Sequence, residues 1–212
     1  MEQLTKYFRV LIPIAYLIGV AGISVKIDSP QYFRVTTFFV PLSFLMLILF
    51  HKPNSRRFWL IMGLIGIMGF SIEAIGTNTG VIFGRYTYGA SLGPSLFGTP
   101  FNMAINWMML VYLVAFVLQR WNTSLALKSV ASAIILTVFD WILEPVAIRL
   151  DMWSWDWVTP PLHNYIGWFL FSLLVFGIFY RFSPKLYNPL ANLFALMHGL
   201  FFIALNLIFR LI

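Results

Sequence analysis

The chain contains no cysteine, and charged residues are scarce. Without cysteine there can be no disulfides, thiolate nucleophiles or cysteine-ligated metal sites. Only 10% of the 212 residues are charged and 60% are hydrophobic, whereas about a quarter of the residues in a soluble domain are charged. The composition therefore predicts an integral membrane protein.

Several motifs are also missing. There is no GxxxxGK[ST], GxGxxG or HExxH, and no aspartate-rich pair of the kind that binds a magnesium diphosphate. The three histidines are scattered, so a zinc site is not expected. The net charge of +7 lies mostly in short loops, where anionic lipid headgroups are the natural counter-charge. We therefore expect no metal, no cofactor, no nucleic acid partner, and a substrate that is neither nucleotide nor diphosphate.

What the chain has in abundance is long apolar runs. A run of about 20 apolar residues spans the hydrocarbon core of a bilayer. Seven such runs are recognised, at about 7–25, 32–50, 58–76, 101–119, 126–148, 163–181 and 189–210. Most connections between them are short, which favours antiparallel neighbours. The prediction is an all-α bundle of about seven transmembrane helices forming a single domain over residues 1–212.

The basic residues predict how the bundle is oriented. With seven spans, nine basic residues share the side of the N-terminus: Lys6, Arg9, Lys52, Arg56, Arg57, Arg120, Lys128, Arg181 and Lys185. Five lie on the other side: Lys26, Arg34, Arg85, Arg149 and Arg210. Basic loops stay cytoplasmic, so we expect a protein of the cell (inner) membrane with its N-terminus in the cytoplasm.

Two connections are longer than the rest, and both fall on the non-cytoplasmic side. They cover about Thr77 to Pro100 and Arg149 to Leu162, and both mix aromatic residues with glycine or proline and few charges. This composition suits segments that lie at the membrane interface or fold over the mouth of the bundle. Loops of this length are more often functional than incidental.

Three of the seven acidic residues, Glu73, Asp140 and Glu144, lie in or at the edge of the apolar runs. A carboxylate near the bilayer centre costs roughly 2.5–3.5 kcal/mol, so such residues usually face inward and are functional. Asp140 and Glu144 are four residues apart, which places them on one helix face about 6 Å apart. Two carboxylates this close in a low dielectric cannot both ionise cheaply, so one is expected to keep its proton and to serve as an acid. If the helix continues through Pro145, the carbonyl of Trp141 is freed. The alternative is a kinked helix whose acids only hydrogen-bond to neighbouring spans.

Glu73 is the third candidate catalytic residue. It would complete an acidic triad with the fifth run, or it would be a structural acid paired with Arg85 or Arg149. Small residues precede it and would let another helix approach closely. These are Gly63, Gly66 and Gly69.

Aromatic residues gather in and beside the two long connections. Their faces can stabilise a nearby cation, although tryptophan and tyrosine also anchor helices at membrane interfaces. The candidate substrate-binding residues are Tyr86, Tyr88, Trp107, Trp141, Trp153, Trp155, Asn164 and Trp168. His198, in the last run, is expected to make an interhelical hydrogen bond rather than to bind a metal.

Taken in order, these residues form a recognisable pattern. It runs E-x-x-G-x-x-x-G-x-x-x-G-x-Y-x-Y from Glu73 to Tyr88, Pro100 with Trp107, D-x-x-x-E-P from Asp140, W-x-W from Trp153, and P-x-x-N-x-x-G-W from Pro161. The pattern resembles the membrane carotenoid-biosynthesis family of gamma-carotene and bisanhydrobacterioruberin hydratases, over about residues 70–170. The resemblance implies addition of water to the terminal isopropylidene double bond of an acyclic or monocyclic carotenoid.

The residues themselves fit such chemistry. A protonated carboxyl of the Asp140 and Glu144 pair would protonate the alkene, aromatic faces would shield the tertiary cation, and water held by the partner carboxylate or Glu73 would attack. Two alternatives stay open. One is an acid-initiated carotenoid cyclase or isomerase, and the other is a non-enzymatic proton-coupled carrier or lipid-binding bundle.

Overall fold

The computed structural model describes the backbone of residues 2–25 and 30–211, and the side chains of residues 2–25 and 37–211. Within these ranges it contains seven α-helices, which confirms the predicted fold class. The helices are α1 (Glu2–Val25), α2 (Pro30–Leu49), α3 (Arg56–Thr79), α4 (Asn102–Leu118), α5 (Leu125–Arg149), α6 (Leu162–Phe182) and α7 (Ala191–Phe209). Of the basic residues used to predict orientation, Lys26 lies outside the described residues and Arg34 outside the described side chains.

The helix boundaries differ from the apolar runs by a few residues. The largest difference is at α1, which begins at Glu2 rather than near residue 7. Polar residues at that end are compatible with a helix but not with hydrocarbon, so the helix extends beyond the apolar run. Glu2 also lies in the first turn, where a negative charge is stabilised by the helix dipole.

The protein is an integral membrane protein. Five helices, α1, α3, α5, α6 and α7, are long and apolar enough to cross a bilayer. The segments Thr37–Leu49 and Asn102–Leu118 are apolar but shorter. Many large apolar side chains on the outside of the bundle are exposed, as expected where lipid rather than water is the surroundings.

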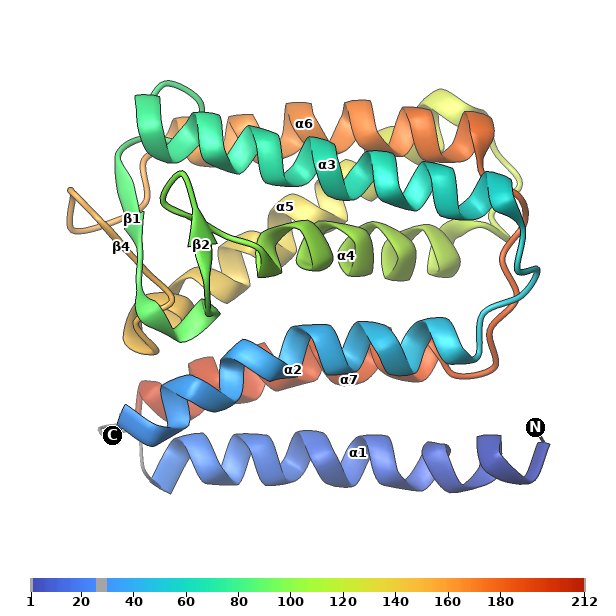
Figure 1. Ribbon diagram of the computed structural model, residues 1–212, viewed down its shortest axis with the longest axis horizontal. Helices are drawn as coiled ribbons and strands as arrows, with labels where there is room; N and C mark the ends of the chain where they lie inside the picture. Colours follow the sequence, from blue (N-terminus) through green and yellow to red (C-terminus); the bar gives the residue numbers. More distant parts are fainter. Residues whose placement is uncertain (1, 26–29, 212) are drawn as a thin grey trace.

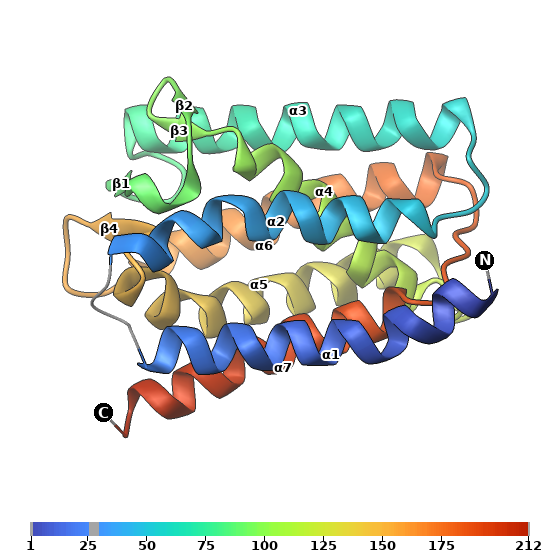
Figure 2. The same cartoon turned by 60° about the horizontal axis from the view of Figure 1, so that its bottom comes forward.

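The central helix of the bundle is α4. It packs against α2, α3, α5, α6 and α7, and Figures 1 and 2 show it enclosed between the other helices. Trp107 and Tyr112 on α4 are fully buried. A helix surrounded in this way can present side chains to an internal site from several of its faces.

A buried polar network fixes α4 at the end away from the long connections. His51 Nδ1 lies 3.0 Å from the hydroxyl of Tyr112. Asn188 donates to that hydroxyl at 3.2 Å and to the carbonyl of Leu47 at 2.8 Å. Burial lowers the pKa of His51 below its ordinary value, so the ring stays neutral at pH 7. This network joins α2, α4 and the start of α7.

The two long connections meet at the opposite end of the bundle from the N-terminus (Figure 1). Strand β1 (Tyr86–Tyr88) from the first pairs antiparallel with β4 (Trp153–Trp155) from the second. A second small sheet joins β2 (Ser95–Leu96) to β3 (Thr99–Pro100), and a short 3₁₀ turn spans Ala90–Leu92. The connections therefore fold over the end of the bundle, which is one of the two placements predicted from their composition.

The pairing of β1 and β4 sorts their side chains onto two faces. Successive side chains of a strand point to opposite faces, and the register places Tyr86 opposite Trp155 and Tyr88 opposite Trp153. Thr87 and Ser154 lie on the exposed side, with their hydroxyls 3.0 Å apart. Two tyrosines and two tryptophans thus share the face that covers the helices.

A left-handed glycine ends α3 and starts the first connection. Gly80 has a φ of 67° and donates its backbone N–H to the carbonyl of Gly76. This conformation costs glycine nothing and strains other residues. Since Glu73 lies two turns before this end, the stop places its carboxyl next to strand β1.

Candidate active site

Glu73 lies near the end of α3 and is only 3% exposed. Its Oε2 accepts hydrogen bonds from the hydroxyls of Tyr86 and Tyr88, each at 2.7 Å, and its Oε1 accepts from the indole N–H of Trp107 at 3.0 Å. Burial and the neighbouring Glu73 carboxyl raise the pKa of Tyr86 and of Tyr88 well above the ordinary value. Both phenols therefore stay protonated and remain donors. All three partners of Glu73 donate hydrogen bonds to it. This arrangement suits a carboxyl that accepts hydrogen bonds better than one that gives a proton to a substrate.

The alternative pairing of Glu73 with an arginine is wrong for the described part of the chain. Neither Arg85 nor Arg149 forms a salt bridge with it there, where the ion pair found joins Lys6 and Glu2. Arg149 instead donates to the carbonyl of Phe209.

Close approach of α3 and α4 positions Trp107 against Glu73. A Cβ added at Gly69 would lie 2.5 Å from Cγ of Trp107, and one added at Gly66 would lie 3.1 Å from the sulfur of Met108. At Gly63 nothing lies within 4 Å. The prediction of a glycine-mediated helix contact is therefore confirmed at positions 66 and 69 and wrong at position 63, where an added Cβ would meet open space.

Gly69→Ala is expected to destabilise the protein, whereas Gly63→Ala on the same helix is not. The new methyl group at position 69 would overlap the Trp107 ring, and overpacking of this kind costs about 1–3 kcal/mol. At position 63 alanine meets open space and gains up to about 1 kcal/mol of helix propensity. Thermal unfolding of both variants in detergent would measure the difference. Equal midpoints for Gly69→Ala and wild type would show that α3 and α4 are not held at this distance.

Asp140 and Glu144 lie one turn apart on α5, 1% and 3% exposed. Oδ2 of Asp140 accepts from the side-chain amide of Asn164 on α6 at 3.0 Å. Oδ1 of Asp140 is buried and has no hydrogen-bond partner among the described residues. A buried oxygen without a partner is costly unless a proton, water or ligand satisfies it. Asp140 thus has one oxygen that the protein holds by a hydrogen bond and one that can bind a proton, water or a ligand.

Glu144 is held by the strand that covers the bundle. Its Oε2 accepts from the indole N–H groups of Trp153 at 3.1 Å and Trp155 at 3.0 Å. The helix continues through Pro145 to Arg149. The W-x-W pattern therefore supplies two parallel donors to one carboxyl oxygen, because residues two apart on a strand point the same way.

All three acids line one small cavity of about 30 Å³. This is room for one or two water molecules, since a water needs roughly 10–15 Å³ of such volume and a few polar partners. The side chains around it come from α3, α4, α5, α6, the β1–β4 sheet and the connection between α3 and β1. They are Glu73, Phe83, Tyr86, Tyr88, Met103, Asn106, Asp140, Leu143, Glu144, Trp153, Trp155, Asn164 and Trp168. We call this space the acidic cavity.

Aromatic rings form much of the wall of the acidic cavity. Tyr86 and Trp155 lie with ring centroids 5.1 Å apart, and Trp168 is stacked on Trp107 at 4.5 Å. A cation formed next to these rings would be stabilised by their negative faces, by about 2 kcal/mol when water is excluded. The cavity thus combines acids with groups that stabilise a positive charge.

Most of the predicted site residues meet here. Tyr86, Tyr88, Trp153, Trp155, Asn164 and Trp168 line the acidic cavity together with the three acids. Trp107 lies directly behind, bonded to Glu73. Trp141 does not join them, because it is 61% exposed on the outer face of α5, and such a position suits an anchor in the lipid interface.

Four cavity residues were not predicted: Phe83, Met103, Asn106 and Leu143. Three are apolar and indistinguishable in the sequence from ordinary core residues. Asn106 had a signal, since a polar amide one turn after Asn102 in a strongly apolar helix is expensive unless it is used.

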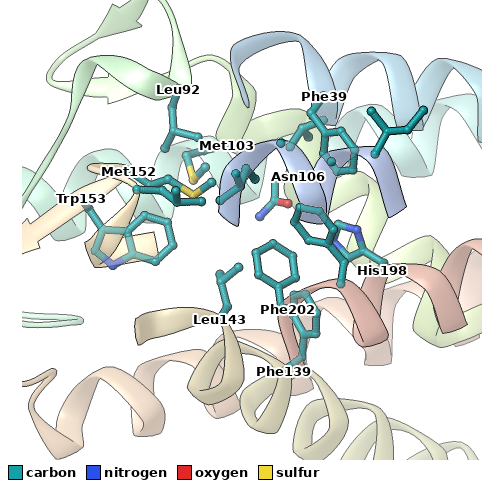
Figure 3. Close-up of a pocket in the computed structure, with 17 residues that line it drawn as sticks. Phe39, Leu92, Met103, Asn106, Phe139, Leu143, Met152, Trp153, His198 and Phe202 are labelled. Carbon is teal, nitrogen blue, oxygen red and sulfur yellow. The ribbon is translucent and has the colours of Figure 1, made fainter. Parts of the chain in front are cut away.

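A larger apolar cavity of about 200 Å³ adjoins the acidic cavity (Figure 3). The two share the side chains of Met103, Asn106, Leu143 and Trp153. From this neck the apolar cavity extends between α1, α2, α4, α5 and α7. The rest of its lining is Ile18, Gly19, Gly22, Ile23, Phe39, Val40, Leu92, Phe139, Leu150, Met152, His198, Phe201 and Phe202.

A third cavity, of about 360 Å³, lies between α4, α5 and α7. It shares Phe139 and His198 with the apolar cavity. His198 Nδ1 lies 3.3 Å from the hydroxyl of Tyr16 on α1, which confirms the predicted interhelical hydrogen bond. Ile134 and Val138 on the third cavity's rim are about half exposed, so this cavity reaches the lipid-facing surface.

Comparison with known proteins agrees with the resemblance read from the sequence. A family model described as carotenoid biosynthesis protein matches residues 33–211. A protein of Haloarcula japonica named bisanhydrobacterioruberin hydratase is 31% identical over 126 residues. That alignment covers 55% of this chain and 42% of the relative, so the chain spans less than half the length of the relative. No solved structure matches.

Proposed function

Because the chain belongs to the carotenoid biosynthesis protein family, we propose that it is a carotenoid hydratase that uses its own carboxyl groups and no cofactor. It would add water to the terminal isopropylidene double bond of an acyclic carotenoid end group. The observation that carries this proposal is the meeting of three buried acids in a water-sized cavity that shares four lining residues with a larger apolar one. A hydrocarbon chain end and a water molecule can meet at such a junction.

Asp140 is the proton donor in this proposal. Glu73 accepts three hydrogen bonds, and Oε2 of Glu144 accepts two, so both are surrounded by donors. Asp140 accepts one, and its Oδ1 is free to carry a proton into the cavity. Two carboxyl groups that share a buried cavity of low dielectric hold one proton between them more readily than two negative charges.

The reaction balances within the acidic cavity. Asp140 gives its proton to the less substituted alkene carbon, and the π bond breaks to leave a tertiary cation. The lone pair of a water molecule forms the C–O bond, and the oxonium proton passes to the Glu144 carboxylate. Return of that proton along the face of α5 to Asp140 restores the starting state. The hydrogen-bond donors around the acids stabilise the carboxylates, and the aromatic faces stabilise the cation.

The apolar cavity is the proposed site of the polyene chain. Its walls are almost entirely hydrocarbon and aromatic, which suits a substrate without polar groups. The third cavity continues past Phe139 and His198 to the lipid-facing side of α4, α5 and α7. A carotenoid would therefore enter from the bilayer and slide its end group toward the acids.

Expression of the chain in a host that makes lycopene or gamma-carotene tests this function. We expect the extracted pigments to gain the mass of one water for each end group that reacts. A pigment isomerised or cyclised without a change in mass would instead identify an acid-initiated isomerase or cyclase. Pigments that stay unchanged would favour a carrier or a lipid-binding bundle.

Trp155→Leu is expected to slow conversion by up to about 30-fold without changing the product. The variant loses an aromatic face at the cavity, worth about 2 kcal/mol to a cation, and one of the two donors to Glu144. Trp155→Phe keeps a ring but loses the N–H, so the pair separates the two contributions. Initial rates of pigment conversion in membranes provide the measurement, and a wild-type rate for Trp155→Leu would remove the residue from the site.

A further inference from the structure

Asn106 is the polar side chain at the neck between the acidic cavity and the apolar cavity. Of the four residues that line both, Met103 and Leu143 are apolar, and the indole N–H of Trp153 is already bonded to Glu144. Figure 3 shows Asn106 near the middle of the view, with its amide among the lining side chains. A chain end that moves from the apolar cavity toward the acids would therefore pass this amide.

The amide of Asn106 has no hydrogen-bond partner among the described residues, unlike other inward-facing helix asparagines. Asn102, one turn earlier, donates to the carbonyls of Thr37 and Leu92. Asn164 donates to Asp140, and Asn206 donates to the carbonyl of Phe202 at 3.0 Å. An amide offers two donors and one acceptor, and leaving them unpaired in an apolar setting is costly. Asn106 is thus equipped to bind a small polar molecule at the neck.

We propose that Asn106 holds the water molecule that captures the cation, and thereby decides between hydration and loss of a proton. The inference rests on the proposed hydratase function. The amide oxygen accepts a hydrogen bond from the water, which leaves a lone pair of the water oxygen aimed at the cationic carbon. The C–O bond forms and the oxonium proton goes to the Glu144 carboxylate. Without a held water, the cation returns a proton from a neighbouring carbon to a carboxylate, which gives back the alkene or an isomer of it.

The test is the fate of the cation in Asn106→Leu, measured as hydrated pigment per pigment that has reacted. In heavy water every protonation leaves deuterium on carbon, so unhydrated pigment that contains deuterium records cations that escaped capture. We expect the hydrated fraction to fall about tenfold, the equivalent of one hydrogen bond, while deuterium accumulates in unhydrated pigment. Asn106→Met, whose flexible side chain fits irregular spaces, is judged by the same ratio if the leucine variant fails to reach the membrane.

Asn122→Leu is the matched control. It makes the same change at an exposed asparagine in the loop between α4 and α5, which lines neither cavity, so its hydrated fraction should equal that of wild type. If the Asn106 variants give the wild-type fraction of hydrated pigment, whatever their rate, the proposed role of Asn106 is overturned, but the proposed hydratase function is not. A wild-type protein that forms no hydrated pigment overturns the proposed function itself, so the two failures are distinguishable.

Discussion

Asp140→Asn is expected to lower the formation of hydrated carotenoid by at least about 100-fold. General acid catalysis contributes about 10²–10⁴-fold to a rate, and asparagine cannot release a proton. The substitution preserves the size and shape of the side chain. Its carbonyl oxygen can still accept the hydrogen bond from Asn164, so the contact between α5 and α6 is retained. The measurement is hydrated pigment per amount of protein in the membrane.

Asp156→Asn is the matched control for Asp140→Asn. It makes the same chemical change in the exposed segment after β4, so conversion should be unaffected. In heavy water the Asp140→Asn variant should also leave no deuterium in recovered substrate, because the first proton transfer is the step removed. Deuterium exchange at the wild-type rate would assign proton donation to another group.

The fold was largely predictable from hydropathy, because the bilayer forces each spanning segment to satisfy its own backbone hydrogen bonds as a helix. All seven apolar runs correspond to helices in the described residues. The small β1–β4 sheet was not predicted, since it joins segments separated by two helices. The Y-x-Y and W-x-W patterns carried a signal for it, because alternate aromatic residues are typical of a strand with one buried face.

The acidic residues of the candidate site could be predicted from the free energy that it costs to place them in a membrane. Acids in apolar helices are expensive, and that alone identified Glu73, Asp140 and Glu144, which the structure brings to one cavity. Aromatic residues carry no such signal, since tryptophan is also common at the membrane–water interface, where it only anchors the helix. The sequence therefore does not distinguish Trp141 from Trp168, although only Trp168 lines the cavity.

The donors around each acid divide the three carboxyls by role. Glu73 binds two tyrosines and a tryptophan from β1 and α4, so it ties the covering sheet to the bundle. Substitution of this residue by glutamine keeps an acceptor for these donors but adds an amide N–H₂ that faces them. We therefore expect Glu73→Gln to reduce conversion because the aromatic side chains bonded to it are displaced. The loss should be no larger than that caused by replacing Asp140 or Glu144. The product should remain the hydrated pigment.

Glu144→Gln is expected to reduce hydrated product as strongly as Asp140→Asn, by at least about 100-fold. Glutamine keeps an oxygen for the indoles of Trp153 and Trp155 but cannot take the proton that water loses on capture. It also removes the second carboxyl whose closeness keeps a proton on the pair. Initial rates of pigment hydration in membranes measure this loss, with Glu2→Gln, an exposed glutamate at the start of α1, as the matched control.

The double variant Asp140→Asn with Glu144→Gln decides whether the two acids act together. Independent contributions would multiply, whereas groups that share one proton fail as a unit, so that removing the second costs little more than removing the first. We expect the double variant to retain about the same residual conversion as either single variant. Losses that multiply would mean that Asp140 and Glu144 act in separate steps without sharing a proton. The acid would then have to keep its proton through burial alone, with Glu144 reduced to accepting the proton from water.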